Sequence, residues 1–323
     1  VVDKGVAVGG GSTGSSSAVV RYNFSTLAGV ISAWESAHRW WSWADHLDVP
    51  EGVGPLAAFH RCPMLFLEPA GFNRAHMVGL LEDVGVEWEV LDRKALARRF
   101  PQLDTRTFYP PCRPDEARFF DDPGELLDCV VTPDAGFIDD PQLAAANLMD
   151  VALLHGSVLR LRTRVVGLAT VGGRLAGVRL ADGSTISAPV VVNAAGPWSS
   201  ELNRLAGVTA EMAVPTRPLR QEVHVVPSPD GFSMDGGGVM VADMDLGYYS
   251  RPQPGGTLLV GGVEPDCDPL EWLEDPDEAS PTPTVECFEA QVWRLARRLP
   301  DLAVPHRPTG LAGVYDVTPD WLP

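Results

Sequence analysis

Hydrophobic residues recur along the chain at two spacings, one typical of helices and one typical of strands. Steps of three and four residues predict a helix that begins after a cap at Ser25. Its apolar face holds Leu27, Ile31, Trp34, His38 and Trp41. For the tryptophans of this segment, helical spacing favours packing in the core over an aromatic box around a cofactor or substrate.

The second half of the chain has clearer boundaries. Asp140 followed by Pro141 marks the start of one helix. Thr284 is the expected cap of another, whose apolar side holds Phe288, Val292, Leu295 and Leu299. Between these helices, residues 164–183 alternate apolar positions with glycine turns, which predicts a small antiparallel meander. Further strands are expected at 64–67, 221–226, 247–251 and 257–262. Strands and helices mixed in this way predict an α/β fold.

Two segments lack this alternation. Residues 190–196 are an unbroken apolar run that ends in small residues, which predicts a parallel strand buried on both faces, with a ligand at its C-terminal end. Residues 264–283 are acidic and rich in proline, so we expect a surface loop with little order.

Composition narrows the class of protein. The chain has 323 residues, of which 45% are hydrophobic and 21% are charged, as expected for a soluble globular protein. A net charge of -18 argues against nucleic acid or anionic membrane surfaces as partners. No apolar run approaches the roughly 20 residues of a membrane-spanning helix, and no export signal opens the chain.

The five cysteines are scattered without a CxxC pair. This distribution argues against a disulfide framework and against a structural zinc site, and it makes the cytoplasm the expected compartment. The chain opens on what resembles the end of a buried strand at Val1 and stops after a turn, so we expect the complete protein to continue at both ends.

A glycine-rich stretch from Gly9 to Gly14 spells GxGxxG, the motif of dinucleotide-binding loops. That motif needs a strand immediately before it and an acidic residue about 20 positions later, at the end of the next strand. Here Asp3 precedes the glycines, and Glu35 lies inside the predicted helix. We therefore interpret Asp3 as the ribose-binding acid of a unit whose own glycine loop would precede Val1. An NAD(P)-dependent dehydrogenase is the alternative.

A series of short segments has the order found in one family of flavoenzymes. The segments are 3–25, 133–139, 163–165, 192–199, 217–218, 249–252, 310–311 and 315–320. Over nearly its whole length, the chain resembles the D-amino-acid oxidase, glycine oxidase and sarcosine oxidase family. The resemblance is greater to its sarcosine and dimethylglycine dehydrogenase-like branch, because no carboxylate-binding arginine stands just before the Thr-Pro-Asp motif at 318–320.

The resemblance implies a two-domain α/β flavoprotein. A Rossmann-like FAD domain would comprise residues 1–58, 138–214 and 305–323, and a mixed-sheet substrate domain would comprise 59–137 and 215–304. The cofactor-binding residues implied are Asp3, Lys4, Gly11, Ser12, Thr13, Gly14, Ser15, Val165, Ala194, Ala195, Gly196 and Trp198. In physical terms, a carboxylate at Asp3 suits the ribose hydroxyls, and a Gly/Ser loop offers hydroxyl and backbone N–H groups to a pyrophosphate.

The resemblance also implies a substrate side of the flavin. Arg21 would bind a substrate carboxylate through its planar fork, and Tyr249 with Tyr315 would line the pocket. A structural salt bridge for Arg21 and core positions for the tyrosines are the alternatives. The implied reaction is oxidation of a C–N bond in a small amine or amino acid by hydride transfer to FAD.

Substitutions relative to the family suggest further properties. Ser15 and Gly313 stand where relatives attach the flavin covalently, so we expect FAD to be bound non-covalently. Leu259 and Val263 replace a lysine and a histidine of sarcosine oxidases, which favours a dehydrogenase with a protein or quinone electron acceptor over an oxidase. A non-catalytic flavin subunit of a larger complex is the remaining alternative.

Overall fold

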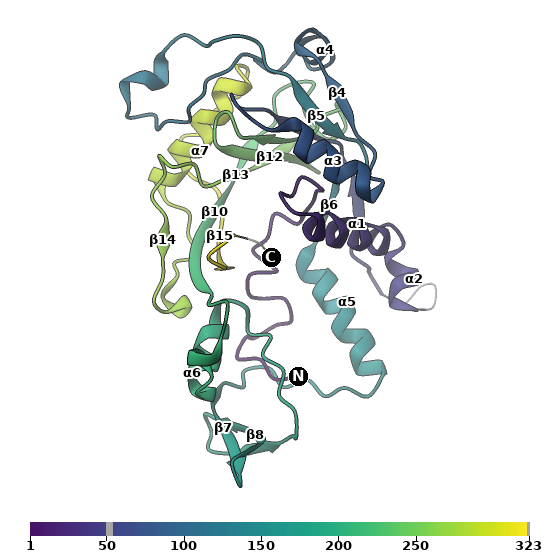
Figure 1. The fold of residues 1–323 in the computed structure, drawn as a ribbon, viewed down its shortest axis with the longest axis vertical. Coiled ribbons are helices and arrows are strands. Elements are labelled where there is room, and N and C mark those ends of the chain that lie inside the picture. Colours follow the sequence, from purple (N-terminus) through teal and green to yellow (C-terminus); the bar gives the residue numbers. More distant parts are fainter. Residues whose placement is uncertain (50–53, 322–323) are drawn as a thin grey trace.

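The computed structural model describes residues 1–49 and 54–321. It is elongated, with a large mixed sheet at one end and a small meander at the other (Figure 1). The large sheet has the order β14 (Glu271–Trp272), β10 (Arg217–Pro227), β13 (Thr257–Gly262), β12 (Tyr248–Gln253), β11 (Met240–Asp243), β3 (Met64–Leu67), β5 (Cys129–Thr132) and β4 (Glu89–Leu91). Neighbouring strands are antiparallel except β11 and β3.

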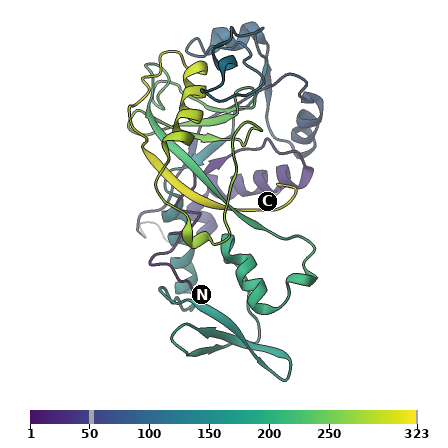
Figure 2. The ribbon, with the colours of Figure 1, turned by 90° about the vertical axis from the view of Figure 1, so that its left-hand side faces the viewer.

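Strand β15 (Gly310–Val317) joins this sheet along β10, from the pair Arg217 and Val317 to the pair His224 and Gly310. Figure 2 shows the two strands running together across the middle of the molecule. The C-terminal segment assigned to the FAD domain therefore contributes a strand to the large sheet. The division into two domains stays a prediction.

Both faces of the large sheet are covered by helices. Helix α7 (Val285–Arg298) begins where Thr284 accepts a hydrogen bond from the N–H of Cys287, at 3.2 Å. Its predicted apolar side is buried against the sheet: Phe288, Val292, Leu295 and Leu299. On the opposite face, α1 (Leu27–Trp41) and α3 (Arg74–Val84) pack on alternate residues of the central strands, for example Met64 and Phe66. Burial of both faces explains why these strands are apolar without a polar side.

Helix α1 corrects two expectations. Its cap is Thr26, whose hydroxyl accepts from the N–H of Gly29, and not Ser25. The buried face is rotated from the predicted one, because Val30 and Ala37 are buried whereas Leu27 and Ile31 are 43% and 44% exposed. Packing against the sheet determines which face is buried, because the three- and four-residue spacing alone is compatible with either face.

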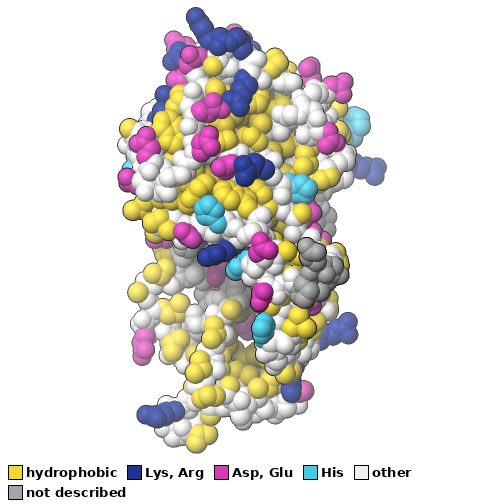
Figure 3. All heavy atoms as spheres, turned by 90° about the vertical axis from the view of Figure 1, so that its right-hand side faces the viewer, with side chains coloured by type: hydrophobic (Ala, Val, Ile, Leu, Met, Phe, Trp, Pro, Cys, Tyr) yellow, Lys and Arg dark blue, Asp and Glu magenta, His cyan; other side chains and the backbone are white. Residues whose placement is uncertain are grey.

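The packing predicted for the tryptophans is confirmed. Trp34 and Trp41 meet edge to face at 5.3 Å between ring centroids, and both contact His38. Apolar side chains still remain exposed among acidic ones on the side of the molecule shown in Figure 3.

A buried ion-pair network ties α7 to the sheet. The Arg298 guanidinium donates to Asp243 at 2.8 Å and to Asp245 at 3.0 Å, and all three side chains are fully buried. Because removal of one partner would leave an uncompensated buried charge, this network fixes the position of the C-terminal end of α7.

Among the smaller elements, the meander and the start of α5 were predicted from the sequence. The meander consists of β7 (Val165–Val171), β8 (Arg174–Leu180) and β9 (Thr185–Ser187), and a second small sheet has the order β1 (Val19–Val20), β6 (Gly136–Ile138) and β2 (Phe59–Arg61). The remaining helices are α2 (Trp43–Leu47), α4 (Arg93–Arg99), α5 (Pro141–Leu154), α6 (Ser199–Ala206) and the 3-10 turns η1 (Ala117–Phe120), η2 (Gly196–Trp198), η3 (Thr209–Glu211) and η4 (Pro276–Glu278). Asp140 caps α5 as predicted, at 2.8 Å from the N–H of Leu143.

The expected parallel strand at 190–196 does not form. Val190 and Val192 are 71% and 81% exposed, and among the described residues no strand lies beside this segment. A buried parallel strand requires hydrogen-bonding neighbours. Outside the named strands, a parallel bridge is found between Val2 and Arg160.

The acidic stretch 264–283 is more ordered than predicted. Asp268 pairs with the fully buried Arg294 at 2.6 Å, and Trp272 of β14 packs under the Arg217 guanidinium. Three of its carboxylates form ion pairs, which composition does not reveal: Asp268, Glu271 and Asp277. Within the described residues, the five cysteines are free thiols, and no helix is long and apolar enough to cross a bilayer.

Candidate functional site

The glycine- and serine-rich segment 9–17 is a run of turns that lies against β15. The Ser12 hydroxyl donates to the Val314 carbonyl at 2.6 Å. Gly14 donates to the Gly9 carbonyl, and a Cβ at Gly14 would lie 2.6 Å from that oxygen, so this position requires glycine. No helix begins at the end of the motif, which therefore lacks the dinucleotide-loop geometry that an NAD(P) enzyme would need.

This segment presents free donors. Within residues 9–17, six backbone N–H groups donate to no acceptor in the described part of the chain: those of Gly9, Gly11, Ser12, Thr13, Ser15 and Ser17. Successive unpaired N–H groups in a turn form a concave site for an anion. The space beside Gly11 is open, since no atom lies within 4 Å of the position of a Cβ there. The segment therefore fits a pyrophosphate-containing cofactor.

Asp3 lies in an extended segment that pairs with the residues leading into β7. Its N–H donates to Arg160 and its carbonyl accepts from Thr163, both at 2.9 Å. Its carboxylate accepts from the N–H of Gly5 at 2.6 Å. Asp3 is thereby brought close to the start of β7, where Val165 lies.

Lys4 and Trp198 come together although they are far apart in the sequence. The Lys4 ammonium lies 4.1 Å from the centre of the Trp198 ring, and both side chains bond to Asp277. Asp277 also pairs with Arg164 at 3.1 Å. Asp277 was not predicted as a site residue, because the acidic stretch around it carried no motif.

Ala194, Ala195 and Gly196 lie where the expected strand is absent. Ala194 is exposed, and Gly196 has a φ of +54° at the start of η2. A Cβ at Gly196 would meet no atom within 4 Å. Turn η2 lies beside β15, the strand that also contacts Ser12.

The end of the serine-rich segment is tied to β12. The Tyr249 hydroxyl donates to the Ser17 hydroxyl at 3.0 Å, and the Arg251 guanidinium donates to the Ser17 carbonyl at 2.7 Å. Arg251 is 4% exposed and stacks 4.2 Å from the centre of the Phe137 ring. Burial lowers the pKa of Arg251 to about 10. Neither Ser17 nor Arg251 was predicted as a site residue, although Arg251 belongs to the 249–252 motif.

Arg21 follows β1 directly and shares one polar cluster with both predicted tyrosines. Its guanidinium donates to the Asn23 carbonyl and stacks 4.3 Å from the centre of the Phe24 ring. Burial lowers the pKa of Arg21, and three nearby ionisable groups act in the opposite direction. Those groups are Tyr315, Glu264 and Tyr249.

Glu264 completes this cluster. It follows β13 with a φ of +50°, an unusual backbone conformation for a residue with a side chain. Burial and the nearby Asp268 carboxylate raise the pKa of its carboxyl group to about 7, against the opposing effect of Arg21. In the described chain, Glu264 forms no ion pair with Arg21 and its carboxyl group makes no hydrogen bond. The sequence predicted a surface loop with little order for this stretch; the place of Glu264 two residues after a buried strand was the available signal.

Ser15 and Gly313 are neighbours in space. A Cβ at Gly313 would lie 2.7 Å from the Ser15 Cβ. Leu259 is buried in β13, in register with Arg251 of β12. The cation nearest in register to Leu259 is therefore Arg251, whose guanidinium is occupied by Ser17 and Phe137.

Comparison with known sequences gives matches over part of the chain. FAD-dependent oxidoreductase domain-containing protein 1 of Mus musculus is 31% identical over 139 residues, which cover 41% of this chain and 27% of the mouse protein. Mitochondrial sarcosine dehydrogenase of Homo sapiens is 30% identical over 180 residues, which cover 54% of this chain and 17% of the human protein. These matches span less than a third of each relative's length.

Solved structures match almost the whole chain. L-proline dehydrogenase from P. horikoshii has a TM-score of 0.72 at 20% identity, covering 96% of this chain and 73% of that one. Glycine oxidase from Geobacillus kaustophilus has a TM-score of 0.72 at 18% identity, covering 100% and 77%. At this identity the likeness shows the fold, and the predicted α/β flavoprotein fold is confirmed.

The family model for FAD-dependent oxidoreductases matches residues 1–323. This match confirms FAD as the cofactor. The chain belongs to the FAD-dependent oxidoreductase family.

Proposed function

We propose that this protein oxidises a C–N bond of a small amino acid, either an N-methyl, secondary or D-amino acid. The observation that carries the proposal is the cluster of a guanidinium and a carboxyl group, Arg21 and Glu264, that influence each other without forming an ion pair. A zwitterionic amino acid carries the complementary pair of charges. Burial strengthens the attraction of Arg21 for the substrate carboxylate and of Glu264 for the substrate ammonium group, because the effective dielectric constant is lower than in water.

Each side chain has a distinct role in this proposal. Arg21 binds the substrate carboxylate through two N–H groups of its fork. Tyr249 and Tyr315 line the space between this anchor and the cofactor. Glu264, with a pKa of about 7, accepts a proton from the substrate ammonium group, because only the uncharged amine is ready to lose hydride. FAD supplies the hydride acceptor.

The cofactor would be held by the residues predicted from the sequence. The unpaired N–H groups around Ser12 would bind the pyrophosphate, and Asp3 with Val165 would hold the adenosine end. Lys4, Trp198 and the 194–196 segment would border the same site. Ser15 and Gly313 provide neither the histidine nor the cysteine through which relatives attach the flavin, which supports a non-covalent flavin.

A substrate panel tests this function. We expect anaerobic bleaching of the flavin absorbance by at least one amino acid among sarcosine, proline, glycine and D-alanine. Amines of the same shape without a carboxylate should react more slowly, because Arg21 has nothing to bind. If no amino acid or amine bleaches the flavin in the purified full-length protein, a non-catalytic flavin subunit is the better assignment.

We further propose a dehydrogenase that passes electrons to a protein or quinone acceptor. Leu259 provides no charge to stabilise the anion that forms when oxygen takes an electron, and Arg251 is engaged elsewhere. Substrate-reduced protein mixed with air-saturated buffer should recover its oxidised spectrum roughly 100-fold more slowly than it turns over with an artificial acceptor.

Variants at the same position sharpen this test. Leu259→Lys should accelerate reoxidation, whereas Leu259→Met should leave its rate unchanged. Stopped-flow spectra give both rates. Reoxidation of the wild-type protein as fast as its turnover would remove the dehydrogenase assignment.

A further inference from the structure

His224 of β10 is buried without satisfying its polar atoms. Its side chain is fully buried, and neither ring nitrogen has a hydrogen-bond partner in the described residues. Its ring meets Phe288 edge to face, with 5.4 Å between centroids. Buried polar atoms without partners are uncommon and costly, so such a residue calls for a physical reason, such as a bound ion.

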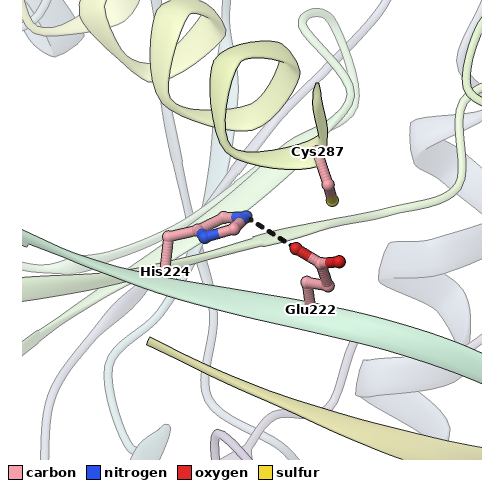
Figure 4. A group of neighbouring side chains, drawn as sticks. All are labelled: Glu222, His224 and Cys287. Atoms are coloured by element: carbon pink, nitrogen blue, oxygen red, sulfur yellow. Dashed lines mark ion pairs between the residues drawn. The ribbon is translucent and has the colours of Figure 1, made fainter. Parts of the chain in front are cut away.

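Two further ligand types face this histidine. Figure 4 shows Glu222, on the same side of β10, and Cys287, in the first turn of α7, pointing toward the ring. The Glu222 carboxylate lies 3.7 Å from His224 Nε2, and one ligand atom from each residue lies within 4.8 Å of the others. Ligand atoms around tetrahedral zinc are roughly 3.4 Å apart, so about 1 Å of side-chain movement closes the set.

We propose that Glu222, His224 and Cys287 form a zinc site that joins strand β10 to helix α7. A nitrogen, a sulfur and a carboxylate oxygen are the ligand types that Zn²⁺ takes in proteins. Glu222 and His224 lie two positions apart on a strand, whereas Cys287 lies more than 60 residues later on a helix, so no CxxC spacing indicates the site. The partial exposure of Cys287 gives the ion an entry path.

The charges around the site balance. Glu222 and a Cys287 thiolate neutralise a divalent cation, and the nearby Arg220 has a second partner in Glu271, at 2.8 Å. Glu222 uses Oε1 for Arg220, while its Oε2 accepts from the N–H of Thr284 and faces His224. Because a carboxylate oxygen has two lone pairs, Oε2 can keep that hydrogen bond and ligate the metal.

Gln291 points to the same place. It is buried one turn after Cys287; its Nε2 lies 3.2 Å from the Cys287 sulfur, and its Oε1 has no partner in the described chain. Rotation about the last side-chain bond exchanges the two ends of the amide and brings Oε1 to the sulfur side. An oxygen there would be available to the water that takes the fourth position of a three-ligand zinc site.

Metal titration tests the site. The purified flavin-containing protein is treated with a chelator and then titrated with Zn²⁺ and, separately, with Co²⁺. We expect one ion per chain, a thiolate-to-cobalt charge-transfer band in the absorption spectrum, and a Tm that rises with Zn²⁺ concentration, because the ion binds only the folded protein.

Variants separate a metal site from a core histidine. His224→Phe and Cys287→Ser should weaken the apparent affinity more than about tenfold and abolish the cobalt band. Cys267→Ser is the matched control: this partly buried cysteine contacts Arg294, outside the set, and should bind like the wild type. Flavin absorbance and circular dichroism verify that each variant is folded. One folded ligand variant is enough for the test. Failure of the wild type to bind either ion, or equal binding by both ligand variants, overturns the proposal.

Discussion

Arg21→Lys is expected to lower kcat/KM for amino acids by about 100-fold, mainly through a higher KM. Lysine keeps the charge but loses the planar fork, so the two parallel hydrogen bonds to the carboxylate are lost. Hydrogen bonds to charged groups contribute about 1.5–3 kcal/mol each, and the loss of one or two of them corresponds to a change of this order. For amines without a carboxylate, kcat/KM should change by less than about threefold.

Steady-state kinetics with matched amino acid and amine substrates check this result. Arg61→Lys is the control, because Arg61 is an exposed arginine that pairs with Asp134 at 2.6 Å, away from the cluster. In Arg61→Lys, kcat/KM for amino acids and kcat/KM for amines should both remain near the wild-type values. An equal loss for amino acids and amines in Arg21→Lys would remove Arg21 from carboxylate binding.

Glu264→Gln is expected to slow flavin reduction by roughly 100-fold at neutral pH, the size of a lost proton acceptor. In the wild type, burial holds the pKa of Glu264 at about 7. Below that pH the carboxyl group is protonated and cannot take the ammonium proton, so the rate should fall as the pH falls through about 7. In Glu264→Gln this step should vanish, leaving only the rise at alkaline pH where the free amino acid loses its own proton.

The pH dependence of anaerobic flavin reduction measures this effect. Glu286→Gln provides a matched control, because Glu286 is an exposed carboxylate on α7 that pairs with Arg113 at 3.0 Å. Its profile should overlay that of the wild type. A wild-type profile without a step near pH 7, or a step that persists in Glu264→Gln, would contradict the proton-accepting role.

Local patterns predicted the elements whose signals lie within one segment. Thr284, with apolar residues at 288, 292, 295 and 299, defined α7, and Asp140 with Pro141 defined the start of α5. The strand predicted at 190–196 does not form. A buried parallel strand depends on neighbouring strands, and the local sequence pattern does not indicate whether they are present. For α1, the spacing allowed two apolar faces, and the sheet determined which one is buried.

The candidate site was predicted in part, and this prediction came from the resemblance to the family and not from local sequence patterns. Arg21, Tyr249 and Tyr315 were identified through resemblance to the family, and the structure brings them into one cluster. Glu264 was missed because its surroundings are acidic and rich in proline, although its burial depends on contacts made by the chain after β13. The His224 cluster was missed since its ligands meet only when α7 packs on β10.

The central claim is that Arg21 and Glu264 hold the two ends of an amino acid beside the flavin. Titration of the visible flavin spectrum with a short, unreactive carboxylate tests it most directly, in the wild type, Arg21→Lys and Glu264→Gln. The account predicts a saturable spectral change in the wild type, at least about tenfold weaker binding in Arg21→Lys, and undiminished binding in Glu264→Gln. Equal affinity in the wild type and Arg21→Lys, or no spectral change at any concentration, would contradict it.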